Sequence, residues 1–273
     1  MRLSALYRHP LKSAAGLSVD ALEIEPRGPR HDRRWIVVDA EGRFVTARQT
    51  AEMVLIRAEP LGDGLWLSAP GLPAIDVPAP ADDAPRRQIT VWKDTVEASI
   101  AAPAADAWLS AFLQRPVRLA YMGEHARRAV DPAYAQPGDE VSFADGYPLL
   151  VISQAALDGL NARLMAEGAA PVTMAHFRPN LVVDGIAAHA EDDWRRVRIG
   201  EVEFDAVKPC TRCVFTTVDP ALGRRRDDGQ PLHLLKEYRR TPAGVTFGMN
   251  LIPRLGASGV GIVRVGDAVT PQA

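Results

Sequence analysis

The sequence predicts a mainly β protein with a few helices, an α+β fold, and three observations lead to this prediction. Short apolar runs separated by turn residues fill most of the chain, which contains 21 Gly and 22 Pro in 273 residues. Only two longer segments place apolar residues at helical spacing. The polar stretch 122–148 follows a break in the pattern near residues 115–125. A loop of that length is usually functional or connects two domains.

The first third of the chain is expected to consist of strands joined by turns. The segment 3–11 is apolar at short intervals, and Pro10 closes this strand. The clearest hairpin has strands over 35–38 and 44–47, joined by a turn at 40–42.

The next segments are expected to form a second hairpin and the first helix. The hairpin covers 52–71 with its turn at 62–64, and the Pro- and Asp-rich piece 70–85 is expected to be an irregular edge or loop. A helix is expected to begin near residue 103, and Pro116 stops it. Its apolar face consists of Trp108, Leu109, Phe112 and Leu113.

The second half begins with a buried strand over 149–153, and Ser153 is placed to cap the following helix, which ends at Gly168. Residues 197–207 alternate apolar and charged side chains, which is typical of a strand. The segments 213–218 and 261–269 are expected to be further strands.

The composition is that of an ordinary globular protein. Hydrophobic residues make up 47% and the formal net charge is −2, so there is no global case for nucleic-acid or membrane binding. No apolar run approaches the roughly 20 residues that span a bilayer. The first residues show no signal-peptide pattern, and two cysteines do not make a disulfide framework. We therefore expect a cytoplasmic protein.

Both cysteines, Cys210 and Cys213, lie in one Cys-x-x-Cys motif just after a predicted strand. The spacing allows a redox dithiol, half of a zinc site, or one working thiolate beside a second cysteine without a role. Arg212 and Lys208 favour a thiolate electrostatically. The alternative without function is two small buried residues in a turn.

Two of these alternatives are weak. Zinc needs four nitrogen or sulfur ligands, and no two of the six histidines have the spacing of a zinc motif. A thioredoxin-type dithiol normally begins a helix, whereas a β-branched run follows Cys213 here.

A second cluster of candidate residues is basic and lies near the N-terminus. It contains Lys12, Ser13, Arg27, Arg30, Arg33, Arg34, Thr46 and Arg48. Guanidinium groups bind phosphate or carboxylate through paired hydrogen bonds, although a solvated face paired with nearby carboxylates is the simpler alternative. Further along, Arg178 and Asn180 are two residues apart, so both side chains can face one ligand from an extended segment.

The motif "KPCTRCVFTTVDP" at 208–220 resembles the MOSC superfamily, the molybdenum-cofactor sulfurase C-terminal domain proteins. The similarity is greatest to the branch of the mitochondrial amidoxime-reducing components and their bacterial relatives. It covers nearly the whole chain through "LYRHPLKSAAGLSVDALEI", "DRRWIVVDAEGRFVTARQ", "FADGYPLLVISQAALDGLN", "HFRPNLVV" and "RIGEVEF". The resemblance implies a MOSC N-terminal β-barrel-like domain over 1–120 and a MOSC β-barrel domain over 121–273.

The resemblance also implies a molybdenum cofactor, with molybdopterin as its organic part and Cys213 as the protein ligand of the metal and the catalytic residue. It implies a set of cofactor-binding residues, namely Lys12, Ser13, Arg33, Arg178, Asn180, Thr211 and Arg212. The pterin dithiolene supplies the other sulfurs, so one soft thiolate is enough. The chain departs from the family at Gly146-Tyr147, where members often carry a hydroxyl-bearing residue. Pyridoxal phosphate binding is a further family-level implication.

The implied activity is the reduction of N-hydroxylated compounds such as hydroxylamines, amidoximes and N-hydroxylated bases, with oxygen leaving as water. Some bacterial relatives append a ferredoxin domain, and this chain stops at Ala273 without one. We therefore expect electrons from a separate flavin or iron–sulfur protein. The alternatives are a cofactor carrier or sulfur-transfer protein that uses Cys213, and a binding module without turnover.

Overall fold

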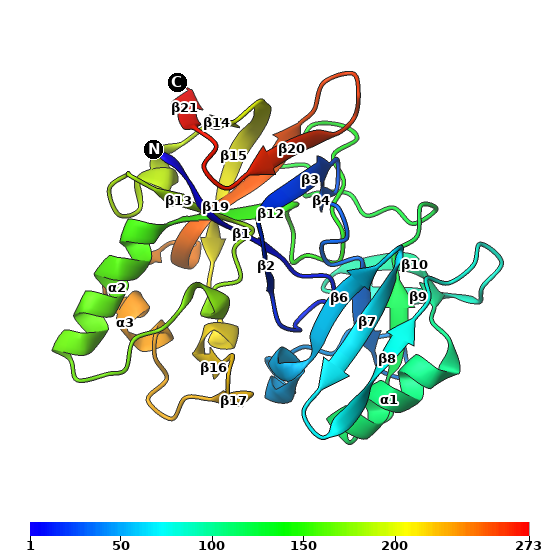
Figure 1. The fold of residues 1–273 in the computed structure, drawn as a ribbon. Coiled ribbons are helices and arrows are strands. Elements are labelled where there is room, and N and C mark those ends of the chain that lie inside the picture. Colours follow the sequence, from blue (N-terminus) through cyan, green and yellow to red (C-terminus); the bar gives the residue numbers. More distant parts are fainter. Residues whose placement is uncertain (273) are drawn as a thin grey trace.

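The computed structural model describes residues 1–272, and strands dominate it (Figure 1). The prediction of a mainly β protein with a few helices is confirmed. Most of the chain is arranged in two lobes, one around a large sheet with two helices and one around smaller sheets with a single helix (Figure 1).

The larger lobe contains a nine-stranded sheet in the order β2-β1-β13-β12-β19-β15-β14-β21, with β18 beside β19. All neighbouring pairs are antiparallel except β12 and β13, which are parallel. The strands are β1 (Arg2–Arg8), β2 (Leu17–Val19), β12 (Leu149–Ser153), β13 (Leu181–Asp184), β14 (Arg196–Ile199), β15 (Val202–Thr211), β18 (Arg240–Thr241), β19 (Gly244–Arg254) and β21 (Val269–Gln272).

Four smaller sheets complete the β structure, in the orders β5-β11-β10-β9, β6-β7-β8, β20-β3-β4 and β16-β17. Their strands are β3 (Ala21–Glu25), β4 (Gly28–Pro29), β5 (Trp35–Val38), β6 (Arg57–Leu61), β7 (Gly64–Ala69), β8 (Leu72–Val77), β9 (Arg86–Val91), β10 (Asp94–Ile100), β11 (Arg118–Tyr121), β16 (Val218–Asp219), β17 (Arg224–Arg225) and β20 (Gly261–Arg264).

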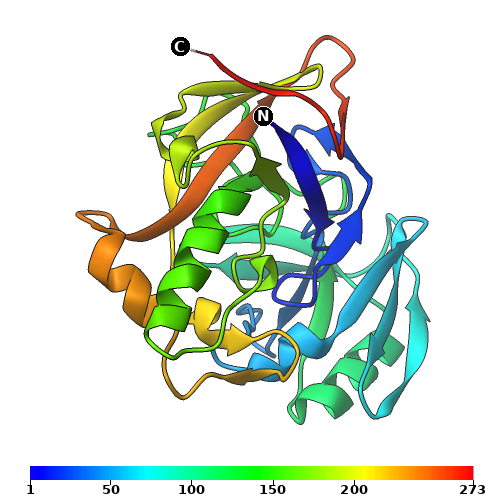
Figure 2. The same cartoon turned by 60° about the vertical axis from the view of Figure 1, so that its left-hand side comes forward.

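The helices lie on the outside of both lobes (Figure 2). In the larger lobe α2 packs on β12 and β13, and α3 packs beside it, whereas α1 packs on β8 and β11. The α-helices are α1 (Pro103–Leu113), α2 (Gln154–Ala166) and α3 (Leu232–Tyr238), and the short 3₁₀ turns are η1 (Ala51–Leu55), η2 (Met174–His176), η3 (Ala190–Asp193) and η4 (Val214–Thr217).

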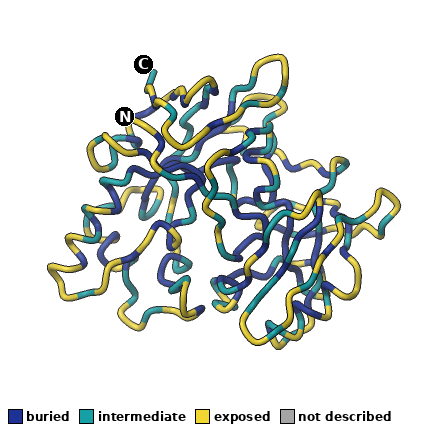
Figure 3. Tube along the Cα trace, in the orientation of Figure 1, coloured by how far each residue is buried: buried dark blue, intermediate teal, exposed yellow. Residues whose placement is uncertain are grey.

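Strand β12 is apolar at successive positions because both of its faces are buried. Leu149 and Val151 pack into the core on one face of the nine-stranded sheet. Leu150 and Ile152 pack into the core on the opposite face, beneath α2 and α3. A strand covered on both faces needs apolar residues throughout, and the buried trace runs through the middle of the lobe (Figure 3).

The N-terminal strands belong to the same lobe as the second half of the chain. β1 pairs with β13, and β3 pairs with β20. The loop 122–148 connects the lobes and contains no named strand, as expected. The division of the chain at residue 120 stays a prediction, since membership of the sheets does not follow chain order.

The predicted strand over 44–47 is wrong. Only an isolated bridge joins Val38 to Phe44, and β5 pairs with β11 instead. The chain then turns, because the Thr46 carbonyl accepts the amide of Thr50 at 3.0 Å.

The predicted hairpin over 52–71 forms only in its second part, as β6 and β7 around the expected glycine turn. The first part is η1, which buries the adjacent residues Met53 and Val54 together. A strand would point these two side chains to opposite faces, so one helical turn suits this core better.

The segment 70–85 is more regular than expected, because it contains the edge strand β8. Pro73 is tolerated there since an edge strand leaves one row of backbone groups unpaired, and the Pro73 carbonyl accepts the Trp108 indole N–H at 2.7 Å. The β9–β10 hairpin that follows was not predicted.

The β-branched run 213–218 does not form the expected strand. It forms η4, in which the Thr216 hydroxyl donates to the Cys213 carbonyl at 3.0 Å and the Thr217 hydroxyl donates to the Val214 carbonyl at 2.8 Å. Threonine hydroxyls that bond to nearby carbonyls compete with strand pairing, which the apolar pattern does not reveal.

The prediction for α2 is correct in position. Ser153 is its N-cap residue and Gly168, with φ +75°, lies just past its end. However, the Ser153 hydroxyl makes no capping hydrogen bond and accepts the His189 amide at 3.3 Å instead.

Candidate functional site

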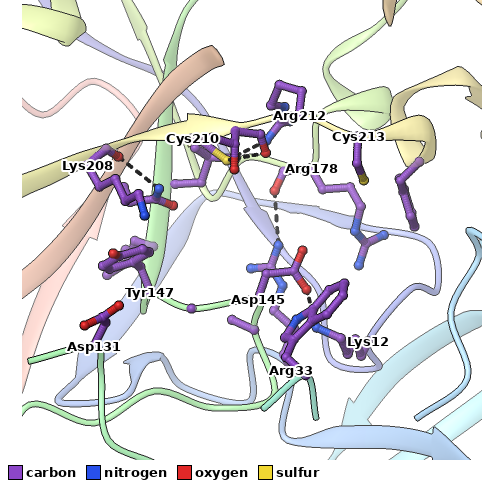
Figure 4. A pocket seen from close by; sticks show the side chains of 18 of the residues that line it. Lys12, Arg33, Asp131, Asp145, Tyr147, Arg178, Lys208, Cys210, Arg212 and Cys213 are labelled. Atoms are coloured by element: carbon purple, nitrogen blue, oxygen red, sulfur yellow. Dashed lines mark hydrogen bonds and ion pairs between the residues drawn. The ribbon is translucent and has the colours of Figure 1, made fainter. Parts of the chain in front are cut away.

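A cavity of about 820 Å³ lies between the two lobes, and Figure 4 shows part of its lining. Its wall comes from loops after β1 and β4, the turns near residues 46 and 92, the loop 122–148, and the chain from η2 to β13 and from β15 to η4. All eight predicted site residues line it: Lys12, Ser13, Arg33, Arg178, Asn180, Thr211, Arg212 and Cys213. Their roles toward a cofactor stay predictions.

Cys213 is exposed at the cavity wall, directly after β15 and at the N-cap of η4. Its backbone is fixed because the Cys213 carbonyl accepts both the amide and the hydroxyl of Thr216, at 3.1 and 3.0 Å. Within residues 1–272 its thiol has no hydrogen-bond partner. The thiol is therefore held in place and free to bind a ligand.

Cys210 is in a different environment, inside β15 rather than after a strand as expected. Its sulfur accepts Arg212 Nη1 at 2.8 Å, and its side chain packs against the core beneath α3. Arg212 Nη2 donates to the Phe177 carbonyl, while its Nε is buried without a partner. The two cysteines of the motif thus have separate surroundings, one bonded and one free.

Lys12 is buried at the floor of the cavity. Its ammonium group donates to the Phe143 carbonyl at 2.7 Å and to Asp145 at 2.6 Å. Burial lowers the pKa of Lys12 to about 8, although the Asp145 carboxylate opposes this shift. Loss of solvent in the cavity would raise the pKa of Asp145, but Lys12 and then Arg48 lower it below its ordinary value.

Arg33 uses most of its donors within the protein. It pairs with the buried Asp32, and it donates to Asn180 Oδ1 at 3.0 Å and to the Arg178 carbonyl at 3.1 Å. The Asn180 amide also donates to Tyr7 and Asp32 and accepts the Leu150 amide. Asn180 therefore has all its hydrogen-bonding capacity filled, which favours a positioning role for it.

Arg178 lines the cavity and keeps one donor without a partner. Its Nη1 donates to the Ala14 carbonyl, but its Nη2 is buried without a partner. Burial and the nearby Arg33 lower the pKa of Arg178 to about 9. A buried guanidinium with an unused N–H is suited to an anionic ligand.

Ser13 and Thr211 are the remaining predicted residues. Ser13 has a left-handed backbone, with φ +69°, at the bend where the chain leaves β1. Thr211 is the last residue of β15 and pairs with Thr246 of β19. Both lie at turning points of the chain, where the backbone approaches the cavity.

The sequence prediction missed the contribution of the loop 122–148. Arg128, which is buried, donates to the carbonyls of Ser142 and Ala144 and pairs with Asp94 at 2.8 Å. These contacts fix the loop so that Asp145 meets Lys12. The available signals were the length of the polar loop and the departure from the family at Gly146-Tyr147, and neither indicated Arg128 or Asp145.

Tyr147 and Asp131, from the same loop, line another part of the cavity, and Figure 4 shows them beside Lys208. Burial raises the pKa of the Tyr147 phenol, as does the Asp131 charge, so the phenol stays neutral. The Lys208 ammonium lies 4.7 Å from the centre of the Tyr134 ring.

Two further findings concern the part of the chain that the structure describes. It contains no group of three or more His, Cys, Asp or Glu side chains arranged to hold a metal ion. None of its helices combines the length and the apolar character needed to cross a membrane.

Comparisons with known proteins identify the class. Residues 1–116 match the MOSC N-terminal beta barrel domain, and residues 138–270 match the MOSC domain. The two matches in this order define a two-domain MOSC protein.

Curated relatives identify the branch. The mitochondrial amidoxime-reducing component 1 of Mus musculus is 36% identical over 98% of this chain and 81% of its own length. The human protein of the same name is 34% identical over 98% and 82%, and the bovine mitochondrial amidoxime reducing component 2 is 32% identical over the same shares. The chain therefore belongs to the family of the mitochondrial amidoxime-reducing components. Among solved structures, the YUAD protein of Bacillus subtilis aligns over 98% of this chain and 93% of its own at 10% identity, with a TM-score of 0.40.

Proposed function

We propose that this protein is a molybdenum-cofactor-dependent reductase of N-hydroxylated compounds, such as hydroxylamines, amidoximes and N-hydroxylated bases. The observation that carries the proposal is the free thiol of Cys213, exposed in a cavity with basic walls. The names of the relatives support the same reaction class.

The residues present fit a phosphate-bearing cofactor. Three arginines that line the cavity have a buried N–H without a partner, namely Nη2 of Arg178, Nε of Arg212 and Nε of Arg48. Unused guanidinium donors suit a dianionic phosphate, and a free thiolate suits a soft metal. When bound, the cofactor supplies the two-electron chemistry that removes oxygen from the substrate.

The chain's own residues then hold and orient the cofactor. Cys213 provides the sulfur ligand, and Arg178 and Arg212 bind the anionic groups. Asn180 and Asp32 fix the guanidinium of Arg33. For a hydroxylamine, two electrons and two protons convert the N–OH compound to the amine and water. The site must therefore admit protons as well as electrons.

Three further expectations belong to this proposal. We propose a separate flavin or iron–sulfur protein as the electron donor, and the cytoplasm as the compartment. Pyridoxal phosphate binding stays a prediction from the family resemblance, and the visible absorbance of the purified protein checks it.

The alternative function, a carrier or sulfur-transfer protein, uses the same free thiol of Cys213 to hold a persulfide or present the cofactor to a client. It explains the exposed thiol equally well, but the names of the relatives favour reduction. Turnover is the property that separates the two functions.

The experiment starts from protein made in cells that synthesise molybdopterin. We expect near-stoichiometric molybdenum, a fluorescent pterin after oxidation, and reduction of amidoximes with reduced viologen but not with NADH alone. The Cys213→Ser variant is the matched control for background reduction. Repeated preparations without molybdenum and pterin would refute the proposal, and a loaded protein without turnover would favour the carrier function.

A further inference from the structure

Arg48 differs from the other arginines of the cavity in how it is held. Its guanidinium lies 4.0 Å from the centre of the Trp92 ring, and its Nη2 is 3.6 Å from Asp145 Oδ2. Its Nε is buried without a partner. The family resemblance assigned no role to Arg48, although the sequence places it in the basic cluster.

Trp92 lies against this guanidinium and is 42% exposed. It lies in the turn between β9 and β10 with φ +58°, a conformation that is unusual for a bulky aromatic residue. Phe44 packs against its ring edge-to-face with centroids 4.9 Å apart. The same turn is anchored through Asp94, which pairs with the buried Arg128 at 2.8 Å. Such strained backbone persists where the surroundings fix it, and it is common at functional sites.

The backbone of Arg48 is also contacted by the second half of the chain. Its carbonyl accepts a hydrogen bond from Arg225 in β17. Arg48 therefore contacts elements from both halves of the chain, and its side chain is directed by Trp92.

The charge balance around Arg48 favours an anion. Its carboxylate neighbour Asp145 already accepts Lys12 at 2.6 Å, which is a closer contact than the one to Arg48. Arg178 adds a further positive charge with an unused donor. The cations at this end of the cavity therefore outnumber the carboxylates, and the excess is only partly neutralised within the protein.

We infer that Arg48 binds the phosphate-bearing end of the cofactor and that Trp92 positions the Arg48 guanidinium by stacking on it. This inference rests on the proposed function. A guanidinium held flat against an aromatic ring loses little freedom when it binds, so its charge-assisted hydrogen bonds contribute more of their strength. Arg48 is a binding residue in this assignment, and Trp92 is a positioning residue that acts through it.

The test measures how fast the loaded protein releases its cofactor on dilution, followed by molybdenum and pterin content. We expect Arg48→Met to release it about tenfold faster or more, because one charge-assisted contact is lost. Arg48→Lys keeps the charge but not the planar fork, so an intermediate rate is expected. The matched control is Arg43→Met, which removes an exposed arginine of the same region that pairs only with Asp39 and Glu41.

The positioning role of Trp92 needs its own comparison. Trp92→Leu should speed release several-fold, Trp92→Phe should restore most of the retention, and Trp66→Leu, outside the cavity, should have no effect. The release rate of Trp92→Leu should also become more sensitive to salt, because an unstacked guanidinium is more exposed to screening.

The outcomes separate the two claims. A wild-type protein that carries no cofactor overturns the proposed function and this inference together. A loaded wild type with unchanged release in Arg48→Met and Arg48→Lys overturns only the inference. If Trp92→Leu and Trp92→Phe release the cofactor equally fast, the stacking role of Trp92 is overturned.

Discussion

Asp145 is the residue at which the basic side chains of the cavity meet. Its carboxylate accepts Lys12 at 2.6 Å and lies 3.6 Å from Arg48. Lys12 and Arg48 lower the pKa of Asp145, so the carboxylate stays ionised and orients both cations. The segment FADGYP that carries part of the family resemblance contains Asp145 but gave it no role, and its partners lie more than 90 residues away in the chain.

Lys12 makes anion binding sensitive to pH. Its pKa is lowered to about 8, so its ammonium group is charged below that pH and neutral above it. We therefore expect the affinity of the cofactor-free protein for sulfate, whose charge is constant in this range, to fall as the pH rises through about 8. Titration calorimetry below and above this pH measures the change.

The Lys12→Arg variant is the control for this prediction, because a guanidinium keeps its charge. In that variant the pH at which sulfate affinity falls should be higher, closer to the pKa of about 9 of Arg178. An unchanged pH profile in Lys12→Arg would show that another group is responsible.

Arg33 has a larger structural role than its sequence position suggested. Removing it leaves the buried Asp32 carboxylate without its ion-pair partner. We expect Arg33→Ala to lower the free energy of unfolding by about 3 kcal/mol. Denaturant unfolding of the cofactor-free protein checks this, with the exposed Arg43→Ala as control. A change as small as that of the control would return Arg33 to a purely ligand-binding role.

Among the elements, the strands and helices with strong periodicity were predicted well. β1, β5, β12, α1 and α2 form where expected, because their apolar patterns match the faces that they bury. The single strand predicted over 197–207 is instead a hairpin of β14 and β15. In the predicted strand 261–269, β20 ends at Arg264 and a turn follows. The predictions for 44–47, 52–56 and 213–218 fail because side-chain hydrogen bonds or local packing override the pattern. Such contacts depend on neighbours that a single sequence does not reveal.

The central strand β19 depends on one glycine. Gly248 has φ +85°, and an added Cβ would lie 2.6 Å from Ile152 Cγ1 and 2.7 Å from the Val151 carbonyl oxygen. We expect Gly248→Ala to destabilise the fold by about 2–3 kcal/mol. Thermal unfolding measures this effect.

The matched control is Gly159→Ala in the middle of α2, where an added Cβ would meet nothing within 4 Å. That change should stabilise the protein by about 0.5–1 kcal/mol, since alanine is the better helix former. Equal effects of the two substitutions would contradict the close packing described for β19.

For the whole molecule, the sequence predicted the members of the site but not how they meet. Eight residues from distant segments line one cavity, and their grouping came from the family resemblance rather than from spacing. Periodicity identifies elements, whereas the pairing of β1 with β13 depends on long-range contacts. The residues that were missed, such as Asp145 and Trp92, lie in a loop and a turn without periodicity.

The sheet order predicts whether the second part of the chain, residues 121–273, folds when it is separated from residues 1–120. Residues 121–273 alone lack Leu3, Leu6, Leu22 and Ile24, which belong to the core of the larger lobe. We expect this fragment to show no cooperative unfolding in circular dichroism, and co-expression with 1–120 to restore it. Cooperative unfolding of the isolated fragment would show that the second domain is independent.

The central claim is that Cys213 alone holds the metal, and the most direct measurement compares Cys213→Ser with Cys210→Ser for activity, molybdenum content and melting temperature. We expect activity to collapse in Cys213→Ser with some cofactor retained through its phosphate, because a hydroxyl is a hard and weakly acidic ligand. Cys210→Ser should lower activity only slightly, since the Cys210 sulfur contacts Arg212 and the Thr211 carbonyl beside the core. Equal and total loss of activity in both variants, with molybdenum retained, would contradict this assignment and indicate a redox dithiol.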